Sequence, residues 1–243
     1  MSTENYNLYS HFRGQVTLHA NKELLCTSDG RSYSYADIDE RSARIARVLT
    51  DLGGSAGDRV TVQVEKSPEA LCLYLACLRA GLVFHPLNMA YTASELDYFL
   101  NNAEPALVVC DPKTLPAIKQ IADSTGCDHV LTLDGDGNGT LAGLTDEAAS
   151  DFGVVARQKD DMAALLYSSG TTGVPKGIML THSNLLRNTE ALVAAWGFTD
   201  ADRLLHALPI FHVHGLFVAI GCVMLSGASM RWLSGYNAGQ RSE

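Results

Sequence analysis

The chain has 243 residues, 47% of them hydrophobic and 19% charged, and this composition is that of an ordinary globular protein. Its formal net charge of −9 at pH 7 argues against a broad nucleic-acid-binding surface. The six cysteines are scattered and form no CxxC pair, which favours buried thiols over disulfides or zinc ligands.

The N-terminal sequence and the longest apolar run bear on localisation. The first fourteen residues, MSTENYNLYSHFRG, are polar and lack the apolar segment of a signal peptide. The longest apolar run, GLFVAIGCVML at residues 215–225, is shorter than a membrane span and predicts a buried helix. We therefore expect a cytoplasmic protein without a membrane span.

Extended and helical patterns alternate along the chain. Strands are expected over residues 59–65, 83–88, 106–111, 129–133, 162–169, 177–182, 203–210 and 229–233. Helices are expected over residues 35–52, 68–80, 92–103, 115–124 and 183–196, and from about residue 213. This alternation predicts an α/β fold with mostly parallel sheets flanked by helices.

Cap and turn residues support several of these boundaries. Ser34, Ser67 and Ser183 can cap the helices that follow them, and Thr92 and Glu95 have the spacing of a capping box. Residues 134–146, DGDGNGTLAGLTD, lack the glutamate and the following helix of a calcium-binding loop. We interpret them as a surface loop.

The stretch YSSGTTGVPKG, residues 167–177, combines hydroxyl side chains, glycines and one lysine. Glycines let the backbone approach a ligand, and hydroxyls and freed N–H groups can surround phosphate oxygens. Lys176 can neutralise part of the phosphate charge. Pro175 precedes this lysine and a strand follows it, which argues against a P-loop. A hairpin connection without a ligand is the alternative, but such a turn needs neither four hydroxyls nor a lysine.

The sequence FHVH contains His212 and His214, which would share one face on a strand and could then bind a metal ion. No third ligand accompanies them, which argues against a metal site. The alternative is a pair of hydrogen-bonded histidines at the start of a buried helix. His206 is expected on a strand, where it faces the core or the rim of a pocket.

The stretch YSSGTTGVPKGIMLTHSNL resembles the phosphate-binding motif of the adenylate-forming superfamily, which includes acyl-CoA synthetases, luciferases and peptide adenylation domains. The segments LHALPIFHVHGL and LRAGLVFHPLN resemble this superfamily too. Within it, HPLNMAYTASELDYFLNNAEPALVVCDP and ALPIFHVHGLFVA are most similar to the malonyl-CoA synthetases.

The resemblance implies an ATP-dependent acid–CoA ligase. A carboxylate, with malonate favoured, would attack the α-phosphorus of ATP, and coenzyme A would then displace AMP from the acyl-adenylate. The β- and γ-phosphates would be held by Ser168, Ser169, Gly170, Thr171, Thr172, Gly173 and Lys176. Thr172 would approach Mg²⁺, His212 would lie beside the acyl substrate and the α-phosphate, and His214 would help to shape the pocket.

The same resemblance divides the chain at residue 233. Residues 1–233 are expected to form part of an AMP-binding N-terminal domain, whereas the polar residues 234–243 do not resemble the family. The family's adenine and ribose contacts and its C-terminal domain with a catalytic lysine have no counterpart in this sequence. The chain by itself is therefore expected to be inactive. The alternative to the ligase is a non-catalytic nucleotide- or protein-binding remnant.

Overall fold

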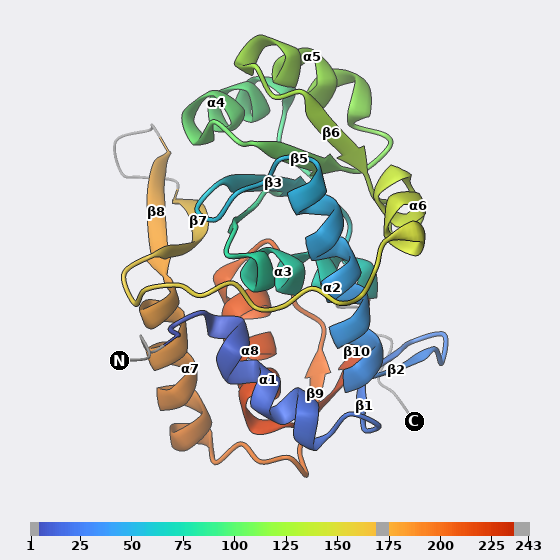
Figure 1. The fold of residues 1–243 in the computed structure, drawn as a ribbon, viewed down its shortest axis with the longest axis vertical. Helices are drawn as coiled ribbons and strands as arrows, with labels where there is room; N and C mark the ends of the chain where they lie inside the picture. Colours follow the sequence, from blue (N-terminus) through green and yellow to red (C-terminus); the bar gives the residue numbers. More distant parts are fainter. Residues whose placement is uncertain (1–4, 169–174, 236–243) are drawn as a thin grey trace. The chain divides into compact units, whose positions relative to one another are not determined.

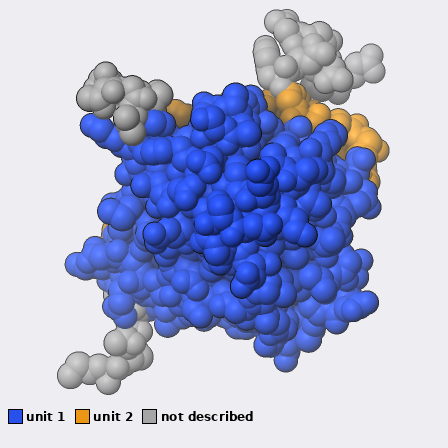
Figure 2. Space-filling model, turned by 90° about the horizontal axis from the view of Figure 1, so that it is seen from above, with its two compact units in different colours: residues 1–11, 39–184 blue, residues 12–38, 185–243 orange. Residues whose placement is uncertain are grey.

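The computed structural model describes residues 5–168 and 175–235, and these form two compact units. One unit consists of residues 1–11 and 39–184, and the other of residues 12–38 and 185–243 (Figure 2). Each unit combines two separate stretches of the chain, and each contains its own β-sheet. Residues 236–243, most of the polar tail, lie outside the described residues.

The first unit contains a six-stranded sheet in the order β6-β5-β3-β4-β7-β8. The strands are β3 (Arg59–Gln63), β4 (Val83–Pro86), β5 (Leu107–Cys110), β6 (His129–Thr132), β7 (Met162–Ser168) and β8 (Lys176–Thr181). All neighbouring strands are parallel except β7 and β8, which form an antiparallel hairpin. The sequence pattern predicted each of these strands, to within a few residues at their ends.

Helices cover both faces of this sheet (Figure 1). Helices α4 (Ala93–Ala103) and α5 (Leu115–Thr125) lie on one face, and α3 (Pro68–Ala80) lies on the other. Every residue of α3 except Glu69 is buried, which explains its continuous apolar sequence. On the other face, Leu96 and Phe99 of α4 pack in one cluster with Val108 of β5 and Ile118 of α5.

The second unit contains a four-stranded sheet in the order β2-β1-β10-β9. Its strands are β1 (Glu23–Thr27), β2 (Ser32–Ser34), β9 (Arg203–His206) and β10 (Ser229–Trp232). Strand β10 is parallel to both of its neighbours, β1 and β9, whereas β2 is antiparallel to β1. Sequence analysis missed β1, β2 and the helix α1 (Leu8–Leu18), because their segments are short or polar. Three helices continue across the boundary between the units: α1, α2 (Tyr35–Asp51) and α7 (His182–Trp196).

Three of the predicted N-caps are confirmed. Ser67 Oγ accepts a hydrogen bond from the backbone N–H of Ala70, and Gly81 ends the same helix with φ of 70°. Thr92 and Glu95 form the predicted capping box of α4. Ser34 Oγ accepts from the N–H of Asp37 at the start of α2. All three signals are local in sequence, which is why the pattern predicted them.

Two predicted boundaries are wrong. Helix α7 begins at His182, and its first turn is closed by Thr181 and Asn184 rather than by Ser183. Residues from Thr140 onward form α6 (Thr140–Glu147) instead of the expected surface loop. The turn before α6 requires glycine, because Gly139 has φ of 142° and an added Cβ would lie 2.2 Å from the Thr132 carbonyl oxygen.

A buried guanidinium connects three segments of the first unit. Arg79, in the last turn of α3, forms an ion pair with Asp39 of α2 and is 1% exposed. It also donates to the Tyr9 hydroxyl at 2.9 Å and to the Phe152 carbonyl at 2.7 Å. Its charge lies over the Tyr9 ring, 4.6 Å from the ring centroid. Burial raises the pKa of Tyr9, so the phenol stays protonated and can donate to Asp39.

A tight turn in the second unit begins the buried helical segment at residues 214–226. The segment consists of a π-helix, η1 (His214–Ala219), followed by α8 (Ile220–Ser226). A Cβ on Gly215 would lie only 2.0 Å from the Pro209 carbonyl oxygen, so the chain can fold back here only with glycine. The Gly215 carbonyl lies 2.8 Å from His206 Nε2, and the His206 ring stacks on Trp232.

Two buried histidines of the first unit are held in their neutral form. Burial lowers the pKa of His85 to about 3, and its Nδ1 lies 2.8 Å from the Thr61 hydroxyl. Burial, reinforced by the charge of Arg157, lowers the pKa of His182 to about 4. His182 Nδ1 accepts the backbone N–H of Leu8, and Asp161 and His11 are the other titratable groups that act on it.

The remaining expectations about composition concern thiols and membranes. All six cysteines lie within the described residues, and each is a free, buried thiol, as predicted. Within residues 5–168 and 175–235, no helix combines the length and apolar character needed to cross a bilayer.

The two neutral histidines predict a loss of stability in acid. An unfolded histidine has a pKa near 6.5, so between pH 6.5 and pH 4 the unfolded chain binds protons that the folded chain does not. The free energy of unfolding should therefore fall by about 2 kcal/mol for each histidine between pH 7 and pH 5. Urea denaturation at both pH values measures this. A His85→Gln variant should lose one such contribution, and an unchanged pH dependence in that variant would contradict the assignment.

The turn at Gly215 predicts that this position does not tolerate a side chain. Gly215→Ala should lower the free energy of unfolding by about 3 kcal/mol or more, because a clash with backbone cannot be relieved by a rotamer change. Gly143→Ala is the matched control, since nothing lies within 4 Å of a Cβ added there. Thermal unfolding of both variants provides the measurement, and equal melting temperatures would show that the turn adapts.

Candidate functional site

The predicted phosphate loop connects β7 to β8, and the structure describes its two ends. Five of its predicted ligands, Ser169, Gly170, Thr171, Thr172 and Gly173, lie outside the described residues. Ser168 ends β7 and Lys176 begins β8, and the two are Cα partners in the antiparallel ladder. The hairpin therefore brings the first predicted hydroxyl and the predicted cation to the same end of the sheet.

Lys176 is accessible where the loop returns to the sheet. Its residue is exposed, as are the following Gly177, Ile178 and Met179 of β8. In the described part of the chain, β8 is an edge strand that pairs only with β7. An exposed ammonium group on an edge strand is free to approach an anionic ligand without a large desolvation cost.

Aromatic side chains support the start of the loop. Tyr167, next to Ser168, packs on Phe99 with ring centroids 4.7 Å apart and on His85 at 5.4 Å. Its hydroxyl donates to Asn102 Oδ1 at 2.5 Å. Burial, with a smaller contribution from Tyr98, raises the pKa of Tyr167 to about 12, so this hydroxyl remains a donor at neutral pH.

The end of the loop is held by α4, the helix that also contains Asn102. The hydroxyl of Tyr98, on α4, donates to the Pro175 carbonyl at 2.9 Å. Sequence analysis did not identify Tyr98 or Asn102 as site residues. Their helix was predicted, but its pattern indicates only an amphipathic helix, and the partners of both residues are more than sixty positions away.

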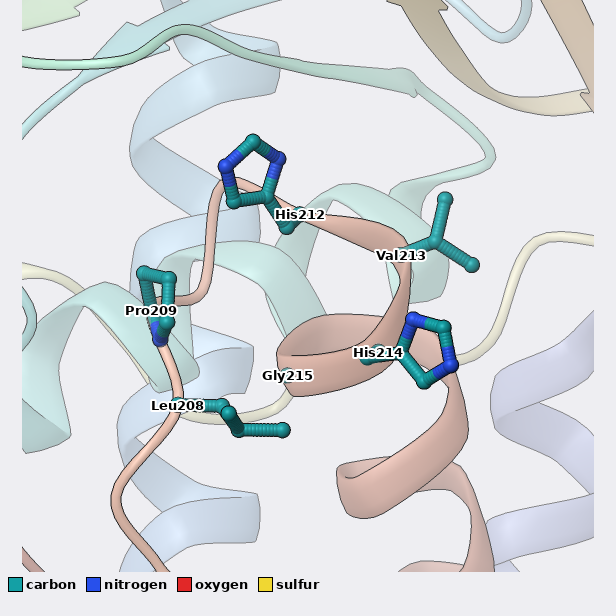
Figure 3. Close-up of a pocket in the computed structure, with 6 residues that line it drawn as sticks. All are labelled: Leu208, Pro209, His212, Val213, His214 and Gly215. Atoms are coloured by element: carbon teal, nitrogen blue, oxygen red, sulfur yellow. The ribbon is translucent and has the colours of Figure 1, made fainter. Parts of the chain in front are cut away.

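A separate pocket lies in the second unit, at the turn that precedes η1. It has a volume of ≈ 580 Å³ and is lined by Leu208, Pro209, His212, Val213, His214 and Gly215 (Figure 3). The lining therefore combines apolar side chains with two imidazoles. Pro209 lines the pocket, whereas the next residue, Ile210, is buried in the core.

The two predicted site histidines lie at the start of the buried helical segment, as the alternative interpretation expected, and not on a strand. His212 lies in the turn and His214 begins η1, so neither is on a strand. Both are exposed, and Figure 3 shows their rings on different sides of the turn. Across the described ranges, no group of three or more His, Cys, Asp and Glu side chains could hold a metal ion.

His206 lies where the sequence predicted it. It ends β9, is 1% exposed and contacts the carbonyl of Gly215. Because Gly215 lines the pocket, His206 supports the pocket from behind. The chain thus contains an exposed lysine beside a hydroxyl-rich loop and, in its other unit, a small pocket with two histidines. The first can bind phosphates, and the second suits a small polar molecule.

Comparison with known proteins gives consistent matches. The AMP-binding enzyme family matches residues 12–242. The mitochondrial malonate–CoA ligase of Xenopus laevis is 32% identical over 202 residues, which are 81% of this chain and 35% of that protein. The oxalate–CoA ligase of Arabidopsis thaliana is 30% identical over 197 residues, which are 80% of this chain and 38% of that protein.

Solved structures agree with the fold described above. ATP-bound MatB from Rhodopseudomonas palustris superimposes with a TM-score of 0.94 and 46% sequence identity. The match covers 98% of this chain and 47% of MatB, so the chain spans less than half the length of these relatives. The extent of the family match and the agreement in fold establish the family. The chain belongs to the AMP-binding enzymes, the adenylate-forming family that its glycine- and hydroxyl-rich loop resembled.

Proposed function

We propose that the protein is an ATP-dependent acid–CoA ligase that acts on a short dicarboxylic acid, with malonate as the preferred substrate. The observation that carries this proposal is the similarity to ATP-bound MatB, at 46% identity over 98% of the chain. The malonate–CoA ligase of Xenopus laevis supports the same substrate class.

The reaction would proceed in two steps. The carboxylate oxygen of the acid attacks the α-phosphorus of ATP, and the bond to pyrophosphate breaks to give an acyl-adenylate. The sulfur of coenzyme A then attacks the acyl carbonyl, AMP leaves, and the thiol proton is released. Substrates supply both nucleophiles, so the protein contributes positioning and charge neutralisation rather than a covalent catalyst.

We assign the phosphate-binding role to Lys176 and to the loop residues Ser168, Ser169, Gly170, Thr171, Thr172 and Gly173. The exposure of Lys176 and its pairing with Ser168 support this assignment. Mg²⁺ would neutralise charge on the phosphates of ATP. Its proposed protein contact is Thr172, which lies outside the described residues.

We assign the acid to the pocket at His212 and His214. Its ≈ 580 Å³ volume is ample for a small dicarboxylate, and its two imidazoles offer hydrogen bonds to carboxylate oxygens. His212 would lie beside the acyl group and the α-phosphate, and His214 would shape the pocket. Leu208, Pro209 and Val213 would exclude water from the carbon chain.

Removing the charge of Lys176 should weaken the use of ATP. Lys176→Ala is expected to raise the KM for ATP roughly 10- to 100-fold, the range given by the loss of a charged hydrogen bond. Its free energy of unfolding should change by less than about 0.5 kcal/mol, because the residue is exposed. ATP–pyrophosphate exchange in the protein as encoded by its gene measures the first effect. Lys119→Ala, an exposed lysine on α5, is the control, and equal KM values in both variants would refute the assignment.

The substrate assignment predicts an order of kcat/KM values. Malonate should exceed methylmalonate, acetate and octanoate. A site that pairs a second carboxylate can disfavour acetate by up to roughly 10⁴-fold, whereas one methylene group gives only about 10- to 200-fold. Coupled measurement of acyl-CoA formation with each acid tests this. Preference for acetate or octanoate would refute malonate as the substrate and leave the adenylation chemistry in place.

A further inference from the structure

Helix α4 contacts both ends of the phosphate loop. Its Tyr98 hydroxyl donates to the carbonyl of Pro175, immediately before Lys176. Its Asn102 Oδ1 accepts from the hydroxyl of Tyr167, immediately before Ser168. Helix α4 is therefore hydrogen-bonded to Tyr167, next to the first predicted phosphate ligand, and to Pro175, next to the last.

The spacing of the two contacts follows from helix geometry. Tyr98 and Asn102 are four residues apart, so they lie on the same face, one turn from each other. Between them in sequence, Phe99 is buried and packs against the Tyr167 ring. The rings of Tyr98 and Tyr167 also meet edge to face, with centroids 6.2 Å apart.

Helix α4 is itself fixed firmly in the unit. The capping box of Thr92 and Glu95 closes its first turn. Leu96, Phe99 and Leu100 are buried in one cluster with residues of β5 and α5. By contrast, β8 has only one described neighbour in the sheet, and its first four residues are exposed. An edge strand of this kind separates from the sheet more readily than a central strand. The hydrogen bond from Tyr98 to Pro175, next to the first residue of β8, therefore has a large effect on the position of Lys176.

We infer that Tyr98 and Asn102 are positioning residues that hold the two ends of the phosphate loop, and with them Ser168 and Lys176, at a fixed place on the sheet. The inference rests on the proposed function, because it assigns the purpose of the anchors to ATP binding. Misplacement of a phosphate contact by about 1 Å is enough to weaken binding and catalysis markedly. Two hydrogen bonds from a rigid helix prevent such misplacement without contact between the helix and ATP.

The chain offers conservative variants and matched controls. Tyr98→Phe and Asn102→Ala each remove one anchor and keep the helix. Tyr91→Phe is the control for the first, since Tyr91 packs on Phe99 in the same cluster. Asn101→Ala is the control for the second, because Asn101 is exposed and its amide donates to Asp97 within the helix. Asn102→Asp keeps an oxygen acceptor for the Tyr167 hydroxyl.

Two measurements on the protein as encoded by its gene test the inference. In hydrogen–deuterium exchange without ATP, Tyr98→Phe and Asn102→Ala should speed exchange in Lys176–Thr181 roughly 2- to 12-fold, the range given by one neutral hydrogen bond. Asn102→Asp and both controls should exchange like the wild type. In ATP–pyrophosphate exchange, the two anchor variants should raise the KM for ATP by a similar factor and leave the KM for malonate unchanged.

The outcomes separate this inference from the proposed function. Unchanged hydrogen exchange in both anchor variants would show that α4 does not hold the loop, and it would overturn the inference. Faster exchange with an unchanged KM for ATP would overturn the positioning role. A wild-type protein that binds no ATP would refute the proposed function and the ATP role of the anchors together. Hydrogen exchange would then still decide whether the anchors hold β8.

Discussion

The first unit is organised around the buried charge of Arg79. An unpaired guanidinium in this position would cost several kcal/mol, so α3 can be buried only when Asp39, the Tyr9 hydroxyl and the Phe152 carbonyl are all in place. These partners come from three separate parts of the chain. One ionic network therefore fixes the N-terminal segment, α2 and the segment before β7 to the helix that connects β3 and β4. Since β4 pairs with β7, the position of Ser168 depends on that arrangement.

The described ends of the phosphate loop belong to a β-hairpin, and no helix N-terminus follows the lysine. In a P-loop, the helix that follows the lysine directs backbone N–H groups and its dipole at the phosphates. Here β8 follows directly, so the charge at the end of the loop comes from Lys176 itself. A hairpin end is less rigid than a helix start, and helix α4 compensates by bonding to Tyr167 and Pro175. Under the proposed function, affinity for phosphate would therefore depend on the contacts between α4 and the residues beside the loop.

The pocket in the second unit is shaped by backbone constraints more than by its side chains. The chain reverses at Pro209 and returns at Gly215, where no Cβ can be accommodated. The helix that begins there is a π-helix, a conformation that occurs often at functional sites because it shifts side chains relative to a regular helix. His206 and Trp232, each at the end of a strand, stack behind the turn. The exposed imidazoles of His212 and His214 therefore project from a turn whose backbone is held by the packing at Gly215 and by His206.

The amino-acid sequence alone determined the features that depend on neighbouring residues. Hydrophobic periodicity predicted the strands of the six-stranded sheet, and Ser67, Thr92 and Gly81 marked helix ends because caps act within one turn. The composition of residues 167–177 indicated phosphate binding, because glycine, hydroxyl and lysine groups suit that ligand wherever they occur together. Tertiary structure alone decided what depends on distant partners. In the sequence, Tyr98 and Asn102 indicate only one face of an amphipathic helix. Their hydrogen bonds to Pro175 and Tyr167 become visible only in the folded structure. For His212 and His214 the sequence left a strand and the start of a buried helix open, and the turn at Gly215 decided in favour of the helix start. The physical reason is that a hydrogen bond or a steric contact acts over a few ångströms in space, whatever the separation along the chain.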